Sequence, residues 1–255
     1  MPHDLELQDE RRPLSGQTPL SIVVLLYPGC TLLDLAGPEA VLAALPGARV
    51  YACWKETGPV PTDGSLTLLA NCTLEDAPQE PDVLFVPGGA EGTIALLNDT
   101  TVLGWLRSRG AGAAWITSVC SGSLVLAAAG LLQGRRATSH WVVRDALALF
   151  GATPVAERVV QDGPIMTGGG VTAGIDFGLQ LAARLSSQGA ARGIQLALEY
   201  APAPPFTSGT PESAGPALTA EVAATFDVAG AEPAIARAAR RLLGAADPGH
   251  AEHGQ

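Results

Sequence analysis

Short hydrophobic runs rich in β-branched residues recur along the chain, separated by segments of helical periodicity. Continuous runs of this kind are typical of strands buried on both faces, as in a parallel sheet. They predict strands over Leu20–Tyr27, Arg49–Trp54, Leu66–Ala70, Asp82–Val86, Ala113–Val119, Val155–Gln161 and Pro164–Thr167. Turn residues are compatible with a hairpin before Leu66–Ala70 and join the last two strands through Asp162-Gly163.

The segments between the strands predict helices, several of which end at glycine or proline. These helices are Pro38–Leu45, Asp99–Arg109, Ser121–Ala129, Trp141–Phe150, Ile175–Ser187 and Pro233–Leu243. The Pro/Ser/Gly-rich segment Ala201–Pro216 predicts a surface loop. Strands alternating with helices indicate an α/β fold, in which a mostly parallel sheet carries helices on both faces. We expect one domain over residues 20–245, with flexible tails at 1–19 and 246–255.

Composition supports a large buried core and narrows the classes of partner. Hydrophobic residues make up 47% of the chain and charged residues 16%, while 25 acidic residues against 15 basic ones leave a net charge of −10. The arginine pairs are isolated and form no basic stripe, which argues against nucleic acid as the main partner. A polar N-terminus without a signal peptide, and no apolar run of about 18 residues, predict a cytoplasmic protein that does not contact membranes.

The cysteines suggest free thiols. In a chain of this size without a secretion signal, reduced cysteines are expected. Neither a CxxC pair nor a His/Cys cluster is present, so no metal site is predicted. Three cysteines are interpreted as packing residues, namely Cys30, Cys53 and Cys72.

The fourth cysteine, Cys120, lies between a predicted strand and a predicted helix. Its neighbours Ser121 and Gly122 are small, which allows the sharp turn of a nucleophile elbow. A thiol near a helix N-terminus is expected to have a lowered pKa, because the exposed N–H groups favour an anion. The alternative is a buried cysteine that acts as a small hydrophobic residue.

Asp34 follows the first predicted strand, within an otherwise apolar segment. A carboxylate among leucines is expected to be desolvated, which raises its pKa unless it is paired. One interpretation is an acid that exchanges a proton with the Cys120 thiol or with a substrate. The alternative is a structural N-cap for a helix over Leu35–Leu45.

Four further positions surround this chemistry in the predicted loops. Gly88 and Gly89 follow a buried strand, so their N–H groups could form part of an oxyanion-type hole or simply a turn. Ser121 could hydrogen-bond a substrate or water, or only begin its helix. His140 is the one histidine outside the terminal regions, and it is a candidate base for a Cys–His pair or a structural residue.

Five segments carry a resemblance to a known family. They are YPGCTLLDLAGPEAVLAAL, VLFVPGG, TSVCSGSLVLAAAGLLQGRRATSHW, TGGGVTAGIDFGLQLAARL and IQLALEYAPAPPF. In this order they resemble the PfpI/ThiJ superfamily, related to class I glutamine amidotransferases, and more closely its isonitrile hydratase branch. The resemblance spans residues 20–206, and nothing after it is long or basic enough for the helix-turn-helix module that some relatives carry.

The resemblance implies a flavodoxin-like three-layer sandwich that works as a homodimer without a cofactor. It implies that Cys120 is the nucleophile, that Asp34 is its acid/base partner where other members carry Glu, and that Gly89 and Ser121 supply backbone donors. The branch usually has Thr after the cysteine, whereas this chain has Ser121, so the hydroxyl is kept and the methyl is lost.

The expected reaction is the addition of water to an isonitrile, a small molecule, through a Cys120 thioimidate. Two alternatives stay open at this point. One is another cysteine-dependent activity of the superfamily, such as a glyoxalase, deglycase or amide hydrolase. The other is a stress or redox sensor in which Cys120 is oxidised without turnover.

Overall fold

The computed structural model describes residues 19–226 and 228–245. Within this part of the chain, the main sheet has seven strands in the order β10-β11-β7-β6-β1-β2-β5. All neighbouring pairs are parallel except β10 with β11. The strands are β1 (Leu20–Leu25), β2 (Ala48–Trp54), β5 (Cys72–Thr73), β6 (Val83–Val86), β7 (Trp115–Val119), β10 (Val159–Asp162) and β11 (Ile165–Gly168).

Two small sheets accompany the main one in the described residues. The predicted hairpin is present, with β3 (Gly58–Pro61) antiparallel to β4 (Thr67–Ala70). A short parallel pair joins β8 (Arg136–Ala137) to β9 (Thr153–Pro154).

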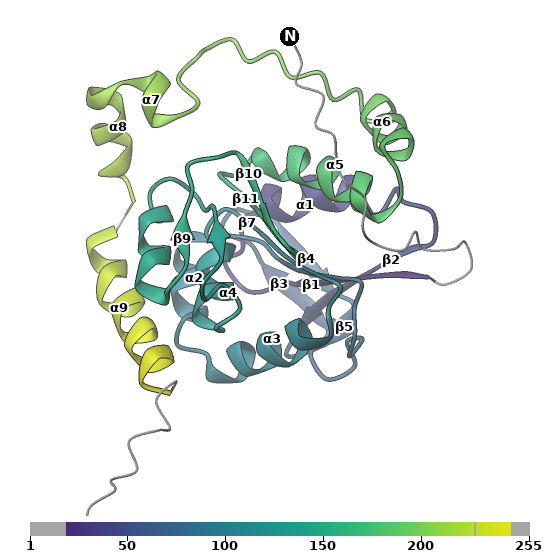
Figure 1. The fold of residues 1–255 in the computed structure, drawn as a ribbon, viewed down its shortest axis with the longest axis horizontal. Helices are drawn as coiled ribbons and strands as arrows, with labels where there is room; N and C mark the ends of the chain where they lie inside the picture. The colour runs from purple at the N-terminus through teal and green to yellow at the C-terminus, as the bar shows by residue number, and fades with distance from the viewer. Residues whose placement is uncertain (1–18, 227, 246–255) are drawn as a thin grey trace, which may run out of the picture.

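Helices cover both faces of the main sheet (Figure 1). One face carries α1 (Leu32–Leu42) packed against α5 (Ala173–Leu185), which continues into α6 (Gln188–Ala197). The other face carries α2 (Ala90–Leu96), α3 (Thr100–Gly112), α4 (Gly122–Ala128), the 3₁₀-helix η1 (Arg144–Phe150) and α9 (Val228–Ala245). The predicted three-layer α/β sandwich is therefore confirmed.

The strand β1 shows why the sheet is buried on both sides. Its side chains alternate between two hydrophobic clusters, with Ile22 and Val24 in one and Val23 and Leu25 in the other. Successive side chains of a strand point to opposite faces, so a central parallel strand covered by helices must be apolar throughout. The unbroken hydrophobic run in the sequence is the consequence.

Several predicted boundaries are wrong. The helix predicted over Pro38–Leu45 is α1, which begins six residues earlier at Leu32 and contains Pro38. The helix predicted over Trp141–Phe150 is a turn followed by η1, and the strand predicted from Val155 begins at Val159. Glycine and proline do not mark every helix boundary here, because packing against α5 holds α1 together across Pro38.

The C-terminal part differs most from the prediction. Two helices of this part were not predicted, α6 and α8 (Pro216–Ala223), and α7 (Pro211–Ala214) interrupts the predicted loop. Earlier in the chain, α2 was not predicted either. The last helix, α9, is longer than expected and contains Pro233. Figure 1 shows the segment from α6 through α7 and α8 running around the outside of the body to α9. The tails predicted at 1–19 and 246–255 lie outside the described residues, apart from residue 19.

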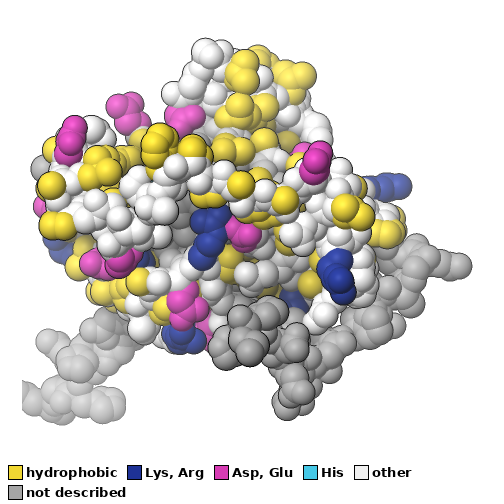
Figure 2. All heavy atoms as spheres, turned by 90° about the horizontal axis from the view of Figure 1, so that it is seen from above, with side chains coloured by type: hydrophobic (Ala, Val, Ile, Leu, Met, Phe, Trp, Pro, Cys, Tyr) yellow, Lys and Arg dark blue, Asp and Glu magenta, His cyan; other side chains and the backbone are white. Residues whose placement is uncertain are grey.

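Charged residues make up 16% of the chain. On the face shown in Figure 2, acidic and basic side chains are scattered among hydrophobic ones. Among residues 19–226 and 228–245, no helix combines the length and apolar character that crossing a membrane requires.

Close backbone packing between α4 and the loop after β6 is the basis of our first prediction. A Cβ added at Gly122 would lie 2.2 Å from the carbonyl oxygen of Val86, which is a backbone atom that cannot move aside alone. We expect Gly122→Ala to destabilise the protein by about 1–3 kcal/mol or more, as overpacking does. Urea unfolding measures this change.

Gly104→Ala is the matched control, because a Cβ there has nothing within 4 Å and Gly104 lies inside α3. We expect it to be neutral or stabilising by up to about 1 kcal/mol. Equal effects of the two substitutions would contradict the proposed packing constraint.

Candidate active site

The topology brings three predicted loops to one edge of the sheet. The strands β7, β6 and β1 are neighbours and parallel, so the loops that leave their carboxyl ends lie side by side. The loop after β1 leads to Asp34, the loop after β6 contains Gly88, and the turn after β7 contains Cys120.

Cys120 occupies a strained turn, as a nucleophile elbow requires. Its φ is +57°, a left-handed value that one other non-glycine residue shares among the described residues. Its N–H donates to the carbonyl oxygens of Gly168 (3.2 Å) and Gly169 (2.7 Å). Its own carbonyl accepts from the hydroxyls of Ser139 (2.9 Å) and Ser123 (3.3 Å). Bonds on both sides of the residue hold the turn in place.

Asp34 lies in the first turn of α1 with its side chain completely buried. Thr31 holds the N-cap position of this helix, so the interpretation of Asp34 as an N-cap is wrong. A Cβ added at Gly88 would lie 2.6 Å from Asp34 Oδ2 and 2.7 Å from Cys120 Cβ. The carboxyl and the cysteine therefore flank the space that the missing side chain of Gly88 leaves open.

The electrostatics of this pair are set by burial. Burial raises the pKa of Asp34 from 3.8 to about 7, although the Cys120 thiol and the Gly88 N–H favour its charged form. These two groups face the carboxyl without completing a hydrogen bond, because neither oxygen of Asp34 has a partner of normal geometry among the described residues. The carboxyl is thus poised to gain or lose a proton near neutral pH.

The thiol behaves differently from the sequence-based expectation. Burial, with the charge of Asp34 as the next cause, raises the pKa of Cys120 well above 9, and the N–H and hydroxyl of Ser121 offset this only in part. The expected lowering by the helix N-terminus is wrong, because α4 is short and a buried thiolate beside a carboxylate loses more solvation than the helix dipole returns. The resting Cys120 is a thiol.

Ser121 takes part in a buried hydrogen-bond network. Its Oγ accepts from the N–H of Gly89 at 3.1 Å and lies 2.8 Å from Thr93 Oγ1. Thr93 in turn contacts the Tyr27 hydroxyl at 3.1 Å. The N–H of Gly89 therefore already has an acceptor, while the N–H of Ser121 faces Cys120. Tyr27 and Thr93 were not predicted as site residues, because their only signal in the sequence is their closeness to predicted loops.

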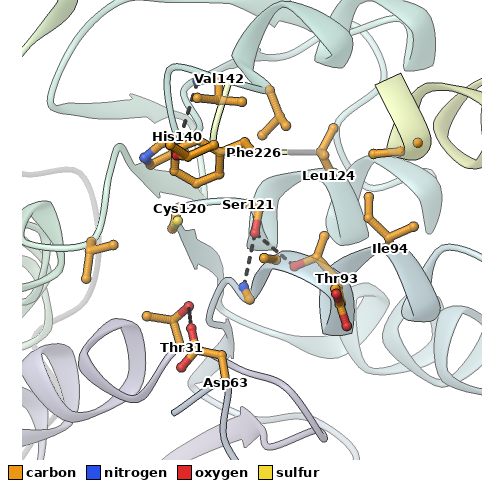
Figure 3. Close-up of a pocket in the computed structure, with 18 residues that line it drawn as sticks. Thr31, Asp63, Thr93, Ile94, Cys120, Ser121, Leu124, His140, Val142 and Phe226 are labelled. Carbon is orange, nitrogen blue, oxygen red and sulfur yellow. Dashed lines mark hydrogen bonds between the residues drawn. The ribbon is translucent and has the colours of Figure 1, made fainter. Parts of the chain in front are cut away.

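A cavity of about 570 Å³ opens onto the thiol (Figure 3). Cys120 and Ser121 lie in the middle of its wall (Figure 3). His140 and Phe226 are on one side of them, and Thr31 and Asp63 are on the other. Most of the remaining wall is apolar and comes from Ile94, Leu124, Val142, Val143 and Val171. The C-terminal segment also contributes to the wall through Thr225, Phe226, Gly230 and Ala231, which sequence reasoning did not identify.

His140 lines the cavity as part of an aromatic group. Its ring centroid lies 5.3 Å from that of Phe226 and 5.7 Å from that of Trp141. Its Nδ1 accepts from the N–H of Val142 at 3.4 Å, and burial lowers the pKa of the imidazole. No hydrogen bond joins it to Cys120 in the described part of the chain, so a catalytic role for His140 stays a prediction.

The other cysteines are buried free thiols, as expected for packing residues. Cys53 and Cys72 face each other on β2 and β5, away from the cavity, and Cys30 lies in the loop after β1. Among residues 19–226 and 228–245, no three His, Cys, Asp or Glu side chains are grouped as a metal site would need.

Known proteins share sequence and fold with this chain. The sequence model of the DJ-1/PfpI family matches residues 20–184. An isonitrile hydratase from Pseudomonas putida is 52% identical over 202 residues, which cover 79% of this chain and 88% of that protein.

Solved structures extend the likeness to the fold. A THiJ/PfpI family protein from Pseudomonas syringae superposes with a TM-score of 0.82 at 45% identity, over 88% of this chain and 92% of that one. Drosophila melanogaster DJ-1beta superposes with a TM-score of 0.66 at 25% identity, over 73% of this chain and all of that one.

The buried carboxyl predicts a specific dependence of stability on pH. Because the pKa of Asp34 is about 7 in the folded protein and 3.8 in its usual environment, the folded state holds this proton more tightly than the unfolded state. The protonated carboxyl of Asp34 therefore stabilises the folded state fully below about pH 4, and this stabilisation is lost as the pH rises through about 7. It amounts to a few kcal/mol, at about 1.4 kcal/mol per pKa unit.

Urea unfolding of the parent and of Asp34→Asn at pH 5 and pH 8 measures this contribution. We expect the free energy of unfolding of the parent, relative to that of the variant, to be lower at pH 8 than at pH 5. A difference between the two proteins that does not change with pH would show that Asp34 titrates normally.

Proposed function

Since this chain belongs to the DJ-1/PfpI family, we propose that it is a cysteine-dependent enzyme that adds water to an isonitrile and releases an N-substituted formamide. The observation that carries the proposal is the placement of a buried carboxyl and a thiol on two sides of Gly88, with the thiol opening onto an apolar cavity. The Pseudomonas putida protein supports the choice of substrate, because its similarity spans most of both chains.

In the proposed first step, Asp34 acts as a base and then as an acid. Its carboxylate takes the proton from the Cys120 thiol and delivers it to the terminal carbon of the isonitrile, while Sγ bonds to the same carbon. The product is a thioimidate, Cys120–S–CH=N–R. No net charge is created, which suits a site where burial disfavours ions on both groups.

In the second step, water adds to the thioimidate carbon. Asp34 takes a proton from the water and passes it to the nitrogen of the substrate as the carbon–oxygen bond forms, which gives the tetrahedral adduct Cys120–S–CH(OH)–NH–R. The carbon–sulfur bond then breaks as the carbon–oxygen double bond forms, and Asp34 transfers the hydroxyl proton to the sulfur, which releases the formamide and restores the thiol. We propose that Ser121 positions the water and that the N–H groups of Gly88 and Ser121 support the developing charge, with Gly89 acting through its bond to Ser121.

The cavity supports a small, neutral, apolar substrate. Its wall is largely aliphatic and aromatic, and the acidic side chains Asp63 and Glu91 on its lining disfavour anions. The reaction as written needs neither metal nor organic cofactor. We also propose a single catalytic domain over residues 20–245 in a cytoplasmic homodimer.

Cyclohexyl isocyanide provides the direct test. We expect the parent protein to convert it to N-cyclohexylformamide, measured by chromatography. We expect Cys120→Ala to abolish the activity and Asp34→Asn to lower kcat/KM by about 10²-fold or more, as loss of an acid/base group does. Cys72→Ala, which removes a buried thiol that does not line the cavity, is the control and keeps the activity.

Two results would redirect the assignment. Turnover of methylglyoxal without turnover of isonitriles would select the glyoxalase or deglycase alternative. Oxidation of Cys120 by peroxide without any turnover would select the sensor, although the raised pKa of this thiol argues against that role, because sensor cysteines have low pKa values.

The proposed role of Asp34 predicts the pH profile. The carboxyl has to be ionised before it can take the thiol proton, and its pKa is about 7. We therefore expect kcat/KM for the isonitrile to rise as the pH increases through about 7, and to lose this transition in Asp34→Asn. A profile that falls above pH 7 would instead indicate that the protonated carboxyl starts the reaction.

A further inference from the structure

A chain of hydroxyl groups runs from the core of the protein to the cavity. The Tyr27 hydroxyl lies 2.9 Å from the carbonyl oxygen of Pro87 and 3.1 Å from Thr93 Oγ1. Thr93 Oγ1 lies 2.8 Å from Ser121 Oγ, which also accepts from the N–H of Gly89. Figure 3 shows the last two contacts converging on Ser121 beside Cys120. Tyr27 and Thr93 are almost completely buried, so water does not compete for these bonds.

Only one arrangement of protons satisfies every contact. The carbonyl of Pro87 can only accept, so Tyr27 uses its single proton there. The contact between Tyr27 and Thr93 then requires Thr93 to donate. Since the proton of Thr93 is used, the contact between Thr93 and Ser121 requires Ser121 to donate. The hydroxyl proton of Ser121 is thus directed at Thr93. The Ser121 hydroxyl is also near enough to Cys120 to favour its thiolate, but no hydrogen bond of normal geometry joins the two side chains among the described residues.

This direction leaves a lone pair of Ser121 facing the site. One lone pair of Oγ accepts from the N–H of Gly89, and Ser121 lines the cavity beside Cys120. A hydroxyl that accepts but does not donate can hold a water by one of its hydrogens, which turns the oxygen lone pair of that water toward an electrophilic carbon. A hydroxyl free to donate would instead bind the lone pair that the attack needs.

We propose that Tyr27 and Thr93 are positioning residues that hold Ser121 as a hydrogen-bond acceptor toward the cavity, so that it orients the attacking water. The inference rests on the proposed isonitrile hydration for the identity of the second step. The direction of the Ser121 proton, however, is a property of the resting protein. It has consequences for Cys120 that do not depend on any substrate.

Thr93→Val tests the proposal because it keeps the shape of the side chain and removes its hydroxyl. Without that acceptor, the proton of Ser121 turns toward the cavity and donates to the Cys120 thiolate. We expect alkylation of Cys120 by iodoacetamide at a fixed pH near 8 to become about threefold to tenfold faster, because a donor to the thiolate lowers its pKa. Thr93→Ser restores the acceptor and returns the rate to the parental value.

Two further variants separate this effect from a general loss of structure around Cys120. Tyr27→Phe removes the hydroxyl at the other end of the hydrogen-bond network and frees the proton of Thr93 to bond Ser121. We expect this variant also to alkylate faster than the parent. Thr117→Val is the matched control, since Thr117 is a buried threonine whose hydroxyl donates to the carbonyl of Leu84 outside this network. If folded Thr93→Val and Tyr27→Phe alkylate at the parental rate, the proposal is wrong.

Turnover supplies the second measurement. We expect Thr93→Val to hydrolyse the thioimidate about tenfold more slowly while forming it at least as fast as the parent, so that rapid quenching and intact-mass analysis detect the Cys120 adduct. Slower formation with no accumulation would contradict the role in water orientation. If isonitriles are not substrates at all, no variant forms the adduct, whereas the alkylation result still decides the direction of the Ser121 proton.

Discussion

The candidate site depends on the close approach of three backbone segments around Gly88. The missing side chain at this position leaves the space in which a carboxyl oxygen of Asp34 and the Cβ of Cys120 both lie. Any larger residue would separate the two groups or break the packing of the loop against the elbow. The position of the carboxyl relative to the thiol is therefore a result of backbone packing, and no hydrogen bond to the carboxyl oxygens is needed to maintain it.

Burial gives this pair its chemical character. A helix N-terminus and a nearby N–H group favour a thiolate, but desolvation and the neighbouring carboxyl outweigh them, so Cys120 rests as a thiol. The same desolvation brings the pKa of Asp34 to about 7. A neutral thiol beside a carboxyl that titrates near neutrality suits proton transfer during bond formation better than it suits reaction with peroxide.

The surroundings of the pair come from segments far apart in the chain. Tyr27 follows β1, Thr93 lies in α2 and Ser121 precedes α4, and their hydroxyls meet in one buried network. The cavity wall likewise joins His140 to Phe226 of the C-terminal segment, which travels around the outside of the sandwich before reaching the site. The network defines the polar side of the cavity, and the aromatic pair defines part of its apolar side.

The sequence by itself determined the α/β class, the central strands and the candidate pair Cys120 and Asp34. Continuous hydrophobic runs and an elbow motif are local signals, and the order of the strands places their loops at a common edge. The tertiary structure alone decided that Asp34 is no N-cap, that the pKa of Cys120 is raised, and that Thr93 and Phe226 belong to the site. Burial and contact between distant segments set these properties, and a linear pattern does not contain them.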